Sequence, residues 1–225
     1  MSKASTRPRP VRAAPPAPRR SRSDRSRKVL PVVVGLVGAM AIVAVLIGLT
    51  MAPSDRVSIE SQTGEVRVAG AALTPYSPGA ADPSVGQPIP ELRGYTFDNQ
   101  PITLSPAGDA KIVIFVAHWC NHCQAEVPRI VDWLAAGHLP GVQLVAVSSG
   151  VDANAPNYPP SKWLEREDWA IPTITDDTDG TAAQAFGLTG YPYFVAVKAD
   201  GTVAARASGE LTLDQLQAMI ATARG

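Results

Sequence analysis

Two short apolar runs and the segment between them set the pattern of the chain's second half. The runs 111–117 and 143–147 are continuous and rich in β-branched residues, which is typical of strands buried on both faces. From Gln124 onward, apolar residues recur at spacings that place them on one face of a helix. A strand, a helix and a second strand in this order indicate an α/β fold around a central sheet.

Turn-forming residues divide the rest of this region into further elements. Asp98 and Asn99 lie between apolar segments and predict a β-hairpin. Thr212 and Gln215 have the spacing of a capping box, so a last helix is predicted to begin at Thr212. The other predicted elements are a helix at 162–166 capped by Ser161, a strand at 171–174, a helix at 181–186, and a hairpin of strands 193–197 and 202–205. We therefore expect a mixed central sheet flanked by helices, preceded by an N-terminal hairpin.

A longer apolar segment, 29–52, lies nearer the N-terminus and contains no charged residue. About 20 apolar residues suffice to cross a bilayer, so the segment predicts a single transmembrane helix. The alternative is a cleaved signal peptide, whose apolar region is usually shorter and ends in small residues. The exit at 49–52 is a poor cleavage site, which favours an uncleaved anchor.

Charge is unevenly divided, although the net charge of the chain is zero. Residues 1–28 contain ten Lys and Arg against one acid, Asp24, and their composition predicts a disordered tail. The positive-inside rule places this tail in the cytoplasm and the chain from Pro53 onward outside the cytoplasmic membrane. We interpret the basic tail as a topology signal rather than a nucleic-acid-binding segment. Residues 53–84 are rich in Pro and Gly turns and predict an extracytoplasmic linker, and 85–225 predict the folded domain.

The only two cysteines, Cys120 and Cys123, lie where the predicted strand 111–117 turns into the helix. Unpaired backbone N–H groups and the helix dipole stabilise an anion at such a position, and the thiolate is the reacting form of cysteine. Cys123 lies one helical turn further on and can form a disulfide with Cys120. A structural disulfide, or a soft-metal site for Cu(I) that also uses His118 and His122, would explain the same pattern. His118 is otherwise interpreted as a surface residue beside the site.

Four motifs in the same order resemble the thioredoxin-like superfamily, and more closely its membrane-anchored TlpA/ResA-like thiol-disulfide oxidoreductases. These motifs are the domain entry 85–88, the hairpin around Asp98, the segment 119–128 with both cysteines, and the segment 190–194. The resemblance covers about 140 residues and leaves out the tail and the anchor. It implies a thioredoxin fold that exchanges disulfides with protein substrates, needs no cofactor or metal, and is served by a membrane electron donor or acceptor.

The resemblance also implies roles for individual residues. Cys120 would be the exposed nucleophile and Cys123 the resolving thiol that attacks the mixed disulfide. Glu126 would lie near the thiols and assist proton transfer; from the sequence alone it would equally fit a solvated helix position.

Three further residues would border the thiols. Trp119 would pack beside the cysteine pair. Pro192 would face the disulfide after a cis peptide bond, and the Tyr191 backbone would pair with an extended substrate.

Two departures from the family pattern bear on the chemistry. Thioredoxin has a buried aspartate six residues before its first cysteine, and Ile114 stands there in this chain. Reductive TlpA-like proteins commonly have proline before the second cysteine, whereas His122 resembles oxidising DsbA-like and isomerase-like relatives. An imidazole beside the Cys120 thiolate would tune it and make the couple more oxidising. The direction of exchange stays open between a reductant, for example in cytochrome c maturation, and an oxidase or isomerase. The other class of function is a copper-binding or non-catalytic interaction module.

Overall fold

The computed structural model describes residues 62–138 and 141–225 of the chain. The predicted tail 1–28, the predicted anchor 29–52 and the first part of the predicted linker lie outside these residues. Within the described part, no helix has the length and apolar character needed to cross a membrane.

A five-stranded mixed sheet forms the centre of the domain, in the order β6-β5-β4-β7-β8. The strands β4 (Lys111–Val116), β5 (Gln143–Ser148) and β6 (Thr173–Thr175) are parallel to one another. The strands β7 (Tyr193–Val197) and β8 (Val203–Ser208) continue the sheet in antiparallel fashion. Every residue of β4 and β7 is buried, because these strands are covered on both faces.

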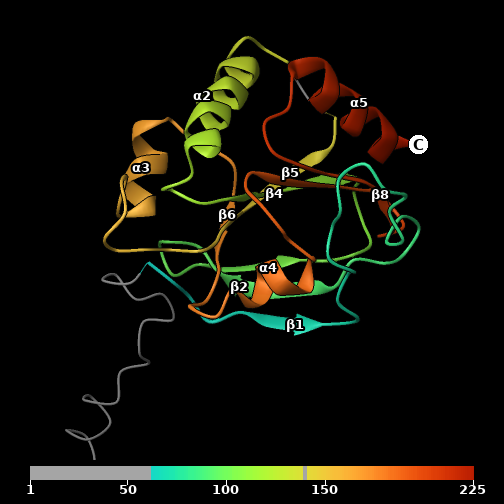
Figure 1. The fold of residues 1–225 in the computed structure, drawn as a ribbon, viewed down its shortest axis with the longest axis horizontal. Coiled ribbons are helices and arrows are strands. Elements are labelled where there is room, and N and C mark those ends of the chain that lie inside the picture. Colours follow the sequence, from blue (N-terminus) through green and yellow to red (C-terminus); the bar gives the residue numbers. More distant parts are fainter. Residues whose placement is uncertain (1–61, 139–140) are drawn as a thin grey trace, which may run out of the picture. The chain divides into compact units, whose positions relative to one another are not determined.

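Alternate residues of β4 belong to two separate hydrophobic clusters. Ile112 and Ile114 pack with α2 (Asn121–Ala135), α3 (Pro160–Arg166) and α5 (Leu213–Arg224). These helices lie on the upper side of the sheet in Figure 1.

The other cluster lies on the opposite side, where Val113 and Phe115 pack with the short helix α4 (Thr181–Ala185). A second, three-stranded antiparallel sheet, β1-β2-β3, completes this layer below the central sheet in Figure 1. The layered α/β architecture with a mixed central sheet confirms the predicted class of the folded domain; the predicted transmembrane helix lies outside the described residues.

The N-terminal hairpin is present as β2 (Glu91–Tyr95) and β3 (Pro101–Leu104), joined around Asn99, which has a positive φ of 58°. A third strand, β1 (Arg67–Ala69), pairs with β2 ahead of the predicted domain boundary at Val85.

Residues 62–84, predicted as part of a linker, are therefore part of the folded unit. Val66 and Leu73 are buried in the hydrophobic cluster, and Asp82 forms an ion pair with Arg206 of β8. The sequence did not predict this packing, because the segment is rich in Pro and Gly turns and has few apolar residues. In addition, Arg206, the partner of Asp82, lies 124 positions away in the chain.

Several predicted boundaries shift by a few residues. The helix α2 begins at Asn121 rather than Gln124, so that Cys120 is its N-cap residue. The helix α3 follows the N-cap residue Pro159, which rules out Ser161 as its cap. The predicted capping box of α5 is confirmed: the Thr212 hydroxyl accepts from the Gln215 N–H at 3.2 Å, and Gln215 Oε1 accepts from the Thr212 N–H at 2.8 Å.

Candidate active site

The two cysteines lie at the point where β4 passes into α2, and both are free thiols. Cys120 has extended backbone angles as the N-cap residue of α2, and Cys123 lies in the first helical turn. Cys120 is only 8% exposed, which corrects the expectation of an exposed nucleophile, and Cys123 is fully buried. Of the two thiols, Cys120 is the one with surface in contact with solvent.

Burial raises the pKa of the Cys123 thiol, and the neighbouring Cys120 and Glu126 raise it further. The N–H of Ala117 donates to Cys123 Sγ at 3.4 Å and partly opposes this effect. Cys123 therefore needs a proton acceptor before it can react as a thiolate.

The segment around Pro192 lies far from Cys120 in the sequence but contacts it in the structure. The Tyr191–Pro192 peptide bond is cis, and the Cys120 thiol donates to the Tyr191 carbonyl at an Sγ···O distance of 3.5 Å. The rings of Trp119 and Tyr191 meet edge to face with centroids 5.8 Å apart. Trp119 is 38% exposed, so it offers an apolar surface to solvent beside the thiols.

A corner at the end of β5 holds both aromatic residues. Trp119 Nε1 donates to the Gly150 carbonyl at 2.6 Å. Gly150 has a φ of +64°, and a β-carbon there would lie 2.9 Å from the Tyr191 hydroxyl. The adjacent Ser149 donates from its hydroxyl to the fully buried Asp176 at 2.6 Å. This corner has no local sequence motif, because its residues come from four separated segments of the chain.

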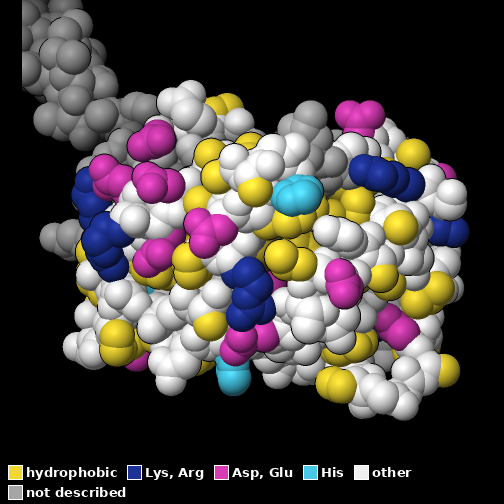
Figure 2. Space-filling view, turned by 90° about the horizontal axis from the view of Figure 1, so that it is seen from above, with side chains coloured by type: hydrophobic (Ala, Val, Ile, Leu, Met, Phe, Trp, Pro, Cys, Tyr) yellow, Lys and Arg dark blue, Asp and Glu magenta, His cyan; other side chains and the backbone are white. Residues whose placement is uncertain are grey.

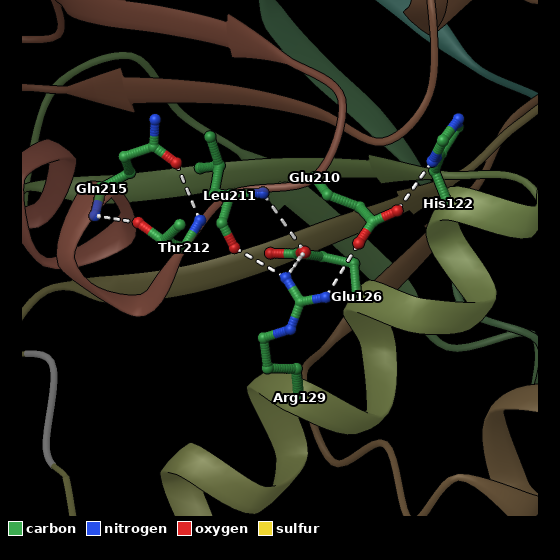
Figure 3. Close-up of polar contacts among 7 residues, drawn as sticks. All are labelled: His122, Glu126, Arg129, Glu210, Leu211, Thr212 and Gln215. Atoms are coloured by element: carbon green, nitrogen blue, oxygen red, sulfur yellow. Dashed lines mark hydrogen bonds and ion pairs between the residues drawn. The ribbon is translucent and has the colours of Figure 1, made fainter.

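The described side-chain partner of His122 is a carboxylate. Its side chain is 67% exposed, and its Nδ1 lies 2.7 Å from Glu210 Oε1, on the loop after β8. Arg129 Nη2 donates to the other oxygen of Glu210 at 2.8 Å. Figure 3 shows His122 and Arg129 projecting from α2 toward this one carboxylate. Hydrogen bonds from His122 and Arg129 keep the pKa of Glu210 below its usual value.

Glu126 is only 2% exposed, so its interpretation as a solvated helix residue is wrong. Its Oε2 accepts from Arg129 Nη1 at 2.8 Å and from the Leu211 N–H at 3.3 Å. Burial raises the pKa of Glu126, while the guanidinium of Arg129 opposes that rise. Glu126 lies three positions after Cys123 on α2 and its charge raises the pKa of that thiol, so this buried carboxyl group is a candidate proton acceptor.

His118 is fully buried, which corrects its interpretation as a surface residue. Its Nδ1 lies 2.7 Å from the Pro156 carbonyl, which can only accept, and its Nε2 accepts from the Asp152 N–H at 3.1 Å. Both ring nitrogens are thus engaged in holding the loop after β5.

The copper-site alternative would need imidazole ligands from His118 and His122 beside the thiols. Neither His118 nor His122 has Nδ1 directed at a cysteine. Across 62–138 and 141–225, no three or more His, Cys, Asp or Glu side chains are grouped so that they could hold a metal ion.

The face that carries α2 and α5 is seen in Figure 2, where hydrophobic side chains are interspersed with charges of both signs. No extended patch of a single sign covers this face.

Comparisons with known proteins agree with the fold. Residues 84–220 match the family described as Redoxin. The chain is 27% identical over 110 residues to the thiol-disulfide oxidoreductase ResA of Oceanobacillus iheyensis, which covers 49% of this chain and 55% of the relative. It is 30% identical over 133 residues to the soluble secreted antigen MPT53 of Mycobacterium tuberculosis, covering 59% of this chain and 70% of that protein.

Among solved structures, the chain resembles MTB DsbF in its mixed oxidized and reduced forms, with a TM-score of 0.50 and 25% sequence identity. The match covers 59% of this chain and 94% of the DsbF chain. The chain spans little more than half the length of the ResA relative.

Proposed function

The chain belongs to the redoxin family and its folded domain is of the thioredoxin type, and from this premise we propose that the protein is a thiol-disulfide oxidoreductase acting on protein thiols and disulfides. The observation that carries the proposal is the unequal burial of the two thiols at the start of α2. Cys120 can be reached from outside, and Cys123 can be reached only by a group bound to Cys120.

In the first step the Cys120 thiolate attacks one sulfur of a substrate disulfide. A Cys120–substrate disulfide forms, the substrate S–S bond breaks, and one substrate sulfur leaves as a thiolate. Backbone N–H groups at the start of α2 stabilise the attacking anion. Trp119 and Tyr191 border Cys120 and give the substrate an apolar surface to lie on.

In the second step Cys123 passes its proton to Glu126 and attacks Cys120 Sγ. The mixed disulfide breaks, the Cys120–Cys123 disulfide forms, and the second substrate thiolate leaves. Two electrons have then passed from the enzyme dithiol to the substrate disulfide. The reverse sequence oxidises a substrate dithiol, so the same residues serve either direction.

The experiment that tests this proposal is insulin reduction with dithiothreitol as electron source. We expect the wild-type chain to accelerate the reaction and Cys120→Ser to abolish the acceleration. Full activity in Cys120→Ser would contradict the proposal.

We further propose that residues 29–52 anchor the protein in the lipid bilayer of the cytoplasmic membrane, with the oxidoreductase domain on the extracytoplasmic side. The support is the uncharged apolar segment and the basic residues that precede it. In that position a membrane electron donor or acceptor would regenerate the cysteine pair. Delivery of electrons to extracytoplasmic cysteines, as in cytochrome c maturation, is the reductant form of this proposal.

Membrane fractionation tests the anchor. The full chain should stay with the membrane after a carbonate wash, whereas a variant lacking 29–52 should be released. Recovery of the full chain in the soluble fraction would refute the anchor and leave the proposed chemistry intact.

A further inference from the structure

Arg129 binds the buried carboxyl group beside the resolving thiol and is itself fixed on three sides. Its Nη1 donates to Glu126 Oε2 and to the Leu211 carbonyl, both at 2.8 Å. Its Nη2 donates to Glu210 at 2.8 Å. Figure 3 shows the guanidinium lying between α2 and the loop after β8, where it bridges these acceptors.

We propose that Arg129 is a positioning residue that holds Glu126 in place and keeps it ionised, so that Glu126 can accept the proton of Cys123 in the second step. This inference rests on the proposed function and names a residue that acts through another. Arg129 does not take the proton itself, because a guanidinium donates hydrogen bonds and stays protonated.

The need for such a residue follows from the burial of Glu126. A carboxylate that is 2% exposed becomes protonated unless a partner compensates its charge, and a protonated Glu126 cannot accept a proton. The Leu211 N–H provides a second hydrogen bond to the same oxygen but no positive charge. Arg129 is the cation that contacts Glu126 among the described residues.

The other charged groups facing Glu126 oppose its ionisation. Cys123 on the same helix becomes negative during the reaction, and Glu210 on the facing loop is a carboxylate. His122 reaches this set only through Glu210. Glu210 has a favourable effect as well, since it holds the guanidinium in the orientation that Glu126 needs.

The fork of Arg129 is suited to this task in a way that lysine is not. Planar donors on two nitrogens bind the three acceptors at once, whereas an ammonium group is a compact charge on a flexible stem. Lysine at this position should supply the charge and lose the bridge.

The two steps can be separated in the full-length reduced protein by reaction with 5,5′-dithiobis(2-nitrobenzoate). Attack by Cys120 releases one coloured thiolate, and attack by Cys123 on the resulting mixed disulfide releases a second. Each phase is followed at 412 nm from about pH 5 to pH 9. The variants are Arg129→Gln, Arg129→Lys and, as a matched control, Arg93→Gln, which removes an exposed arginine paired with Glu91 on β2.

We expect Arg129→Gln to slow the second phase about tenfold at pH 7 and to move its rising limb roughly one to three pH units higher, the usual effect of an arginine on a neighbouring acid. The first phase should stay within about twofold of wild type. Arg129→Lys should recover part of the shift, and Arg93→Gln should match wild type in both phases.

Three results would overturn the proposal. One is a second-phase pH profile of Arg129→Gln that coincides with that of Arg93→Gln. Another is an equal loss in both phases, which would assign Arg129 a purely structural role; circular dichroism and the lysine variant distinguish this from a failure to fold. A third is an unshifted profile with a uniformly lower rate. If the wild-type protein shows neither phase, the proposed function itself fails instead.

Discussion

Replacing Asp82 by asparagine should strongly destabilise the domain, because it leaves a buried guanidinium without its counter-charge. The Arg206 side chain is fully buried, and its Nε donates to Asp82 Oδ2 at 2.7 Å while Nη2 donates to the other carboxylate oxygen. Arg206 also donates to the Thr74 carbonyl at 2.8 Å and to the Tyr193 hydroxyl at 3.0 Å, and lies over the Tyr76 ring.

The magnitude follows from the burial of the pair. Removing one partner of a buried ion pair costs about 3–5 kcal/mol, mostly as the penalty of the uncompensated charge. Asp82 is 11% exposed and asparagine can still accept one hydrogen bond, which places the expected loss near the lower end of that range. With a urea dependence of about 1–3 kcal/mol per molar, a loss of about 3 kcal/mol lowers the unfolding midpoint by about 1–3 M.

The measurement is urea unfolding of the full chain followed by tryptophan fluorescence, with Asp98→Asn as the control. Asp98 is an exposed turn residue, so its replacement removes the same charge without touching a buried partner. A midpoint for Asp82→Asn that equals the Asp98→Asn midpoint would refute this assignment of stability to the Asp82–Arg206 pair.

The same pair predicts a pH dependence. The hydrogen bond from Arg206 holds the pKa of Asp82 below its usual value, so the unfolded chain binds the proton more readily than the folded one. The stabilisation is therefore complete above about pH 4, the ordinary carboxyl value, and is lost as the pH falls through the folded-state value. The difference between wild type and Asp82→Asn should shrink below about pH 4. A difference that persists unchanged to pH 2 would contradict the assignment.

Four further variants test the site and its supports. Cys123→Ser should accumulate a mixed disulfide between Cys120 and a protein substrate, which mass spectrometry would detect. Rapid turnover without accumulation of this mixed disulfide would be inconsistent with a resolving role for Cys123. Ser149→Ala removes the hydroxyl bond to Asp176 and should raise KM for insulin at least about twofold with little change in kcat, and an unchanged KM would argue against this corner as a support. Gly150→Ala introduces a strained positive φ and a close contact, so it should lower the thermal midpoint by several degrees, about 1–3 kcal/mol; a midpoint equal to wild type would be unexpected. Thr212→Ala removes the capping box of α5 and should cost about 1 kcal/mol in urea unfolding, against no change if the cap is unimportant.

Features that depend on neighbouring residues were predictable from the sequence. The continuous apolar run at 111–117 identified β4, since a strand covered on both faces needs no alternation. The capping box of α5 was found because Thr212 and Gln215 lie three positions apart. The position of both cysteines at a helix start followed from the same kind of local pattern.

Features that depend on residues far apart were not predictable. Arg206 and Asp82 are 124 positions apart, and Arg129 and Glu210 are 81 apart. No local periodicity marks such pairs, because each forms only when the topology brings two loops or strands together. His118 was misjudged for the same reason: its partners on the loop after β5 are invisible from the residues beside it.

The charged groups around the thiols also include contacts between residues far apart in the sequence. The sequence assigned His122 to the Cys120 thiolate because the two lie two positions apart, yet the described partner of its Nδ1 is Glu210. Glu210 also binds Arg129, and Arg129 binds Glu126, so one chain of contacts joins the residue beside Cys120 to the carboxyl group coupled to Cys123. The field at either thiol is the sum over this set and falls off over several ångströms, so no single member determines it. The dipeptide between the cysteines is therefore an incomplete guide to the direction of exchange: the loop after β8 contributes an acid of its own and fixes the arginine.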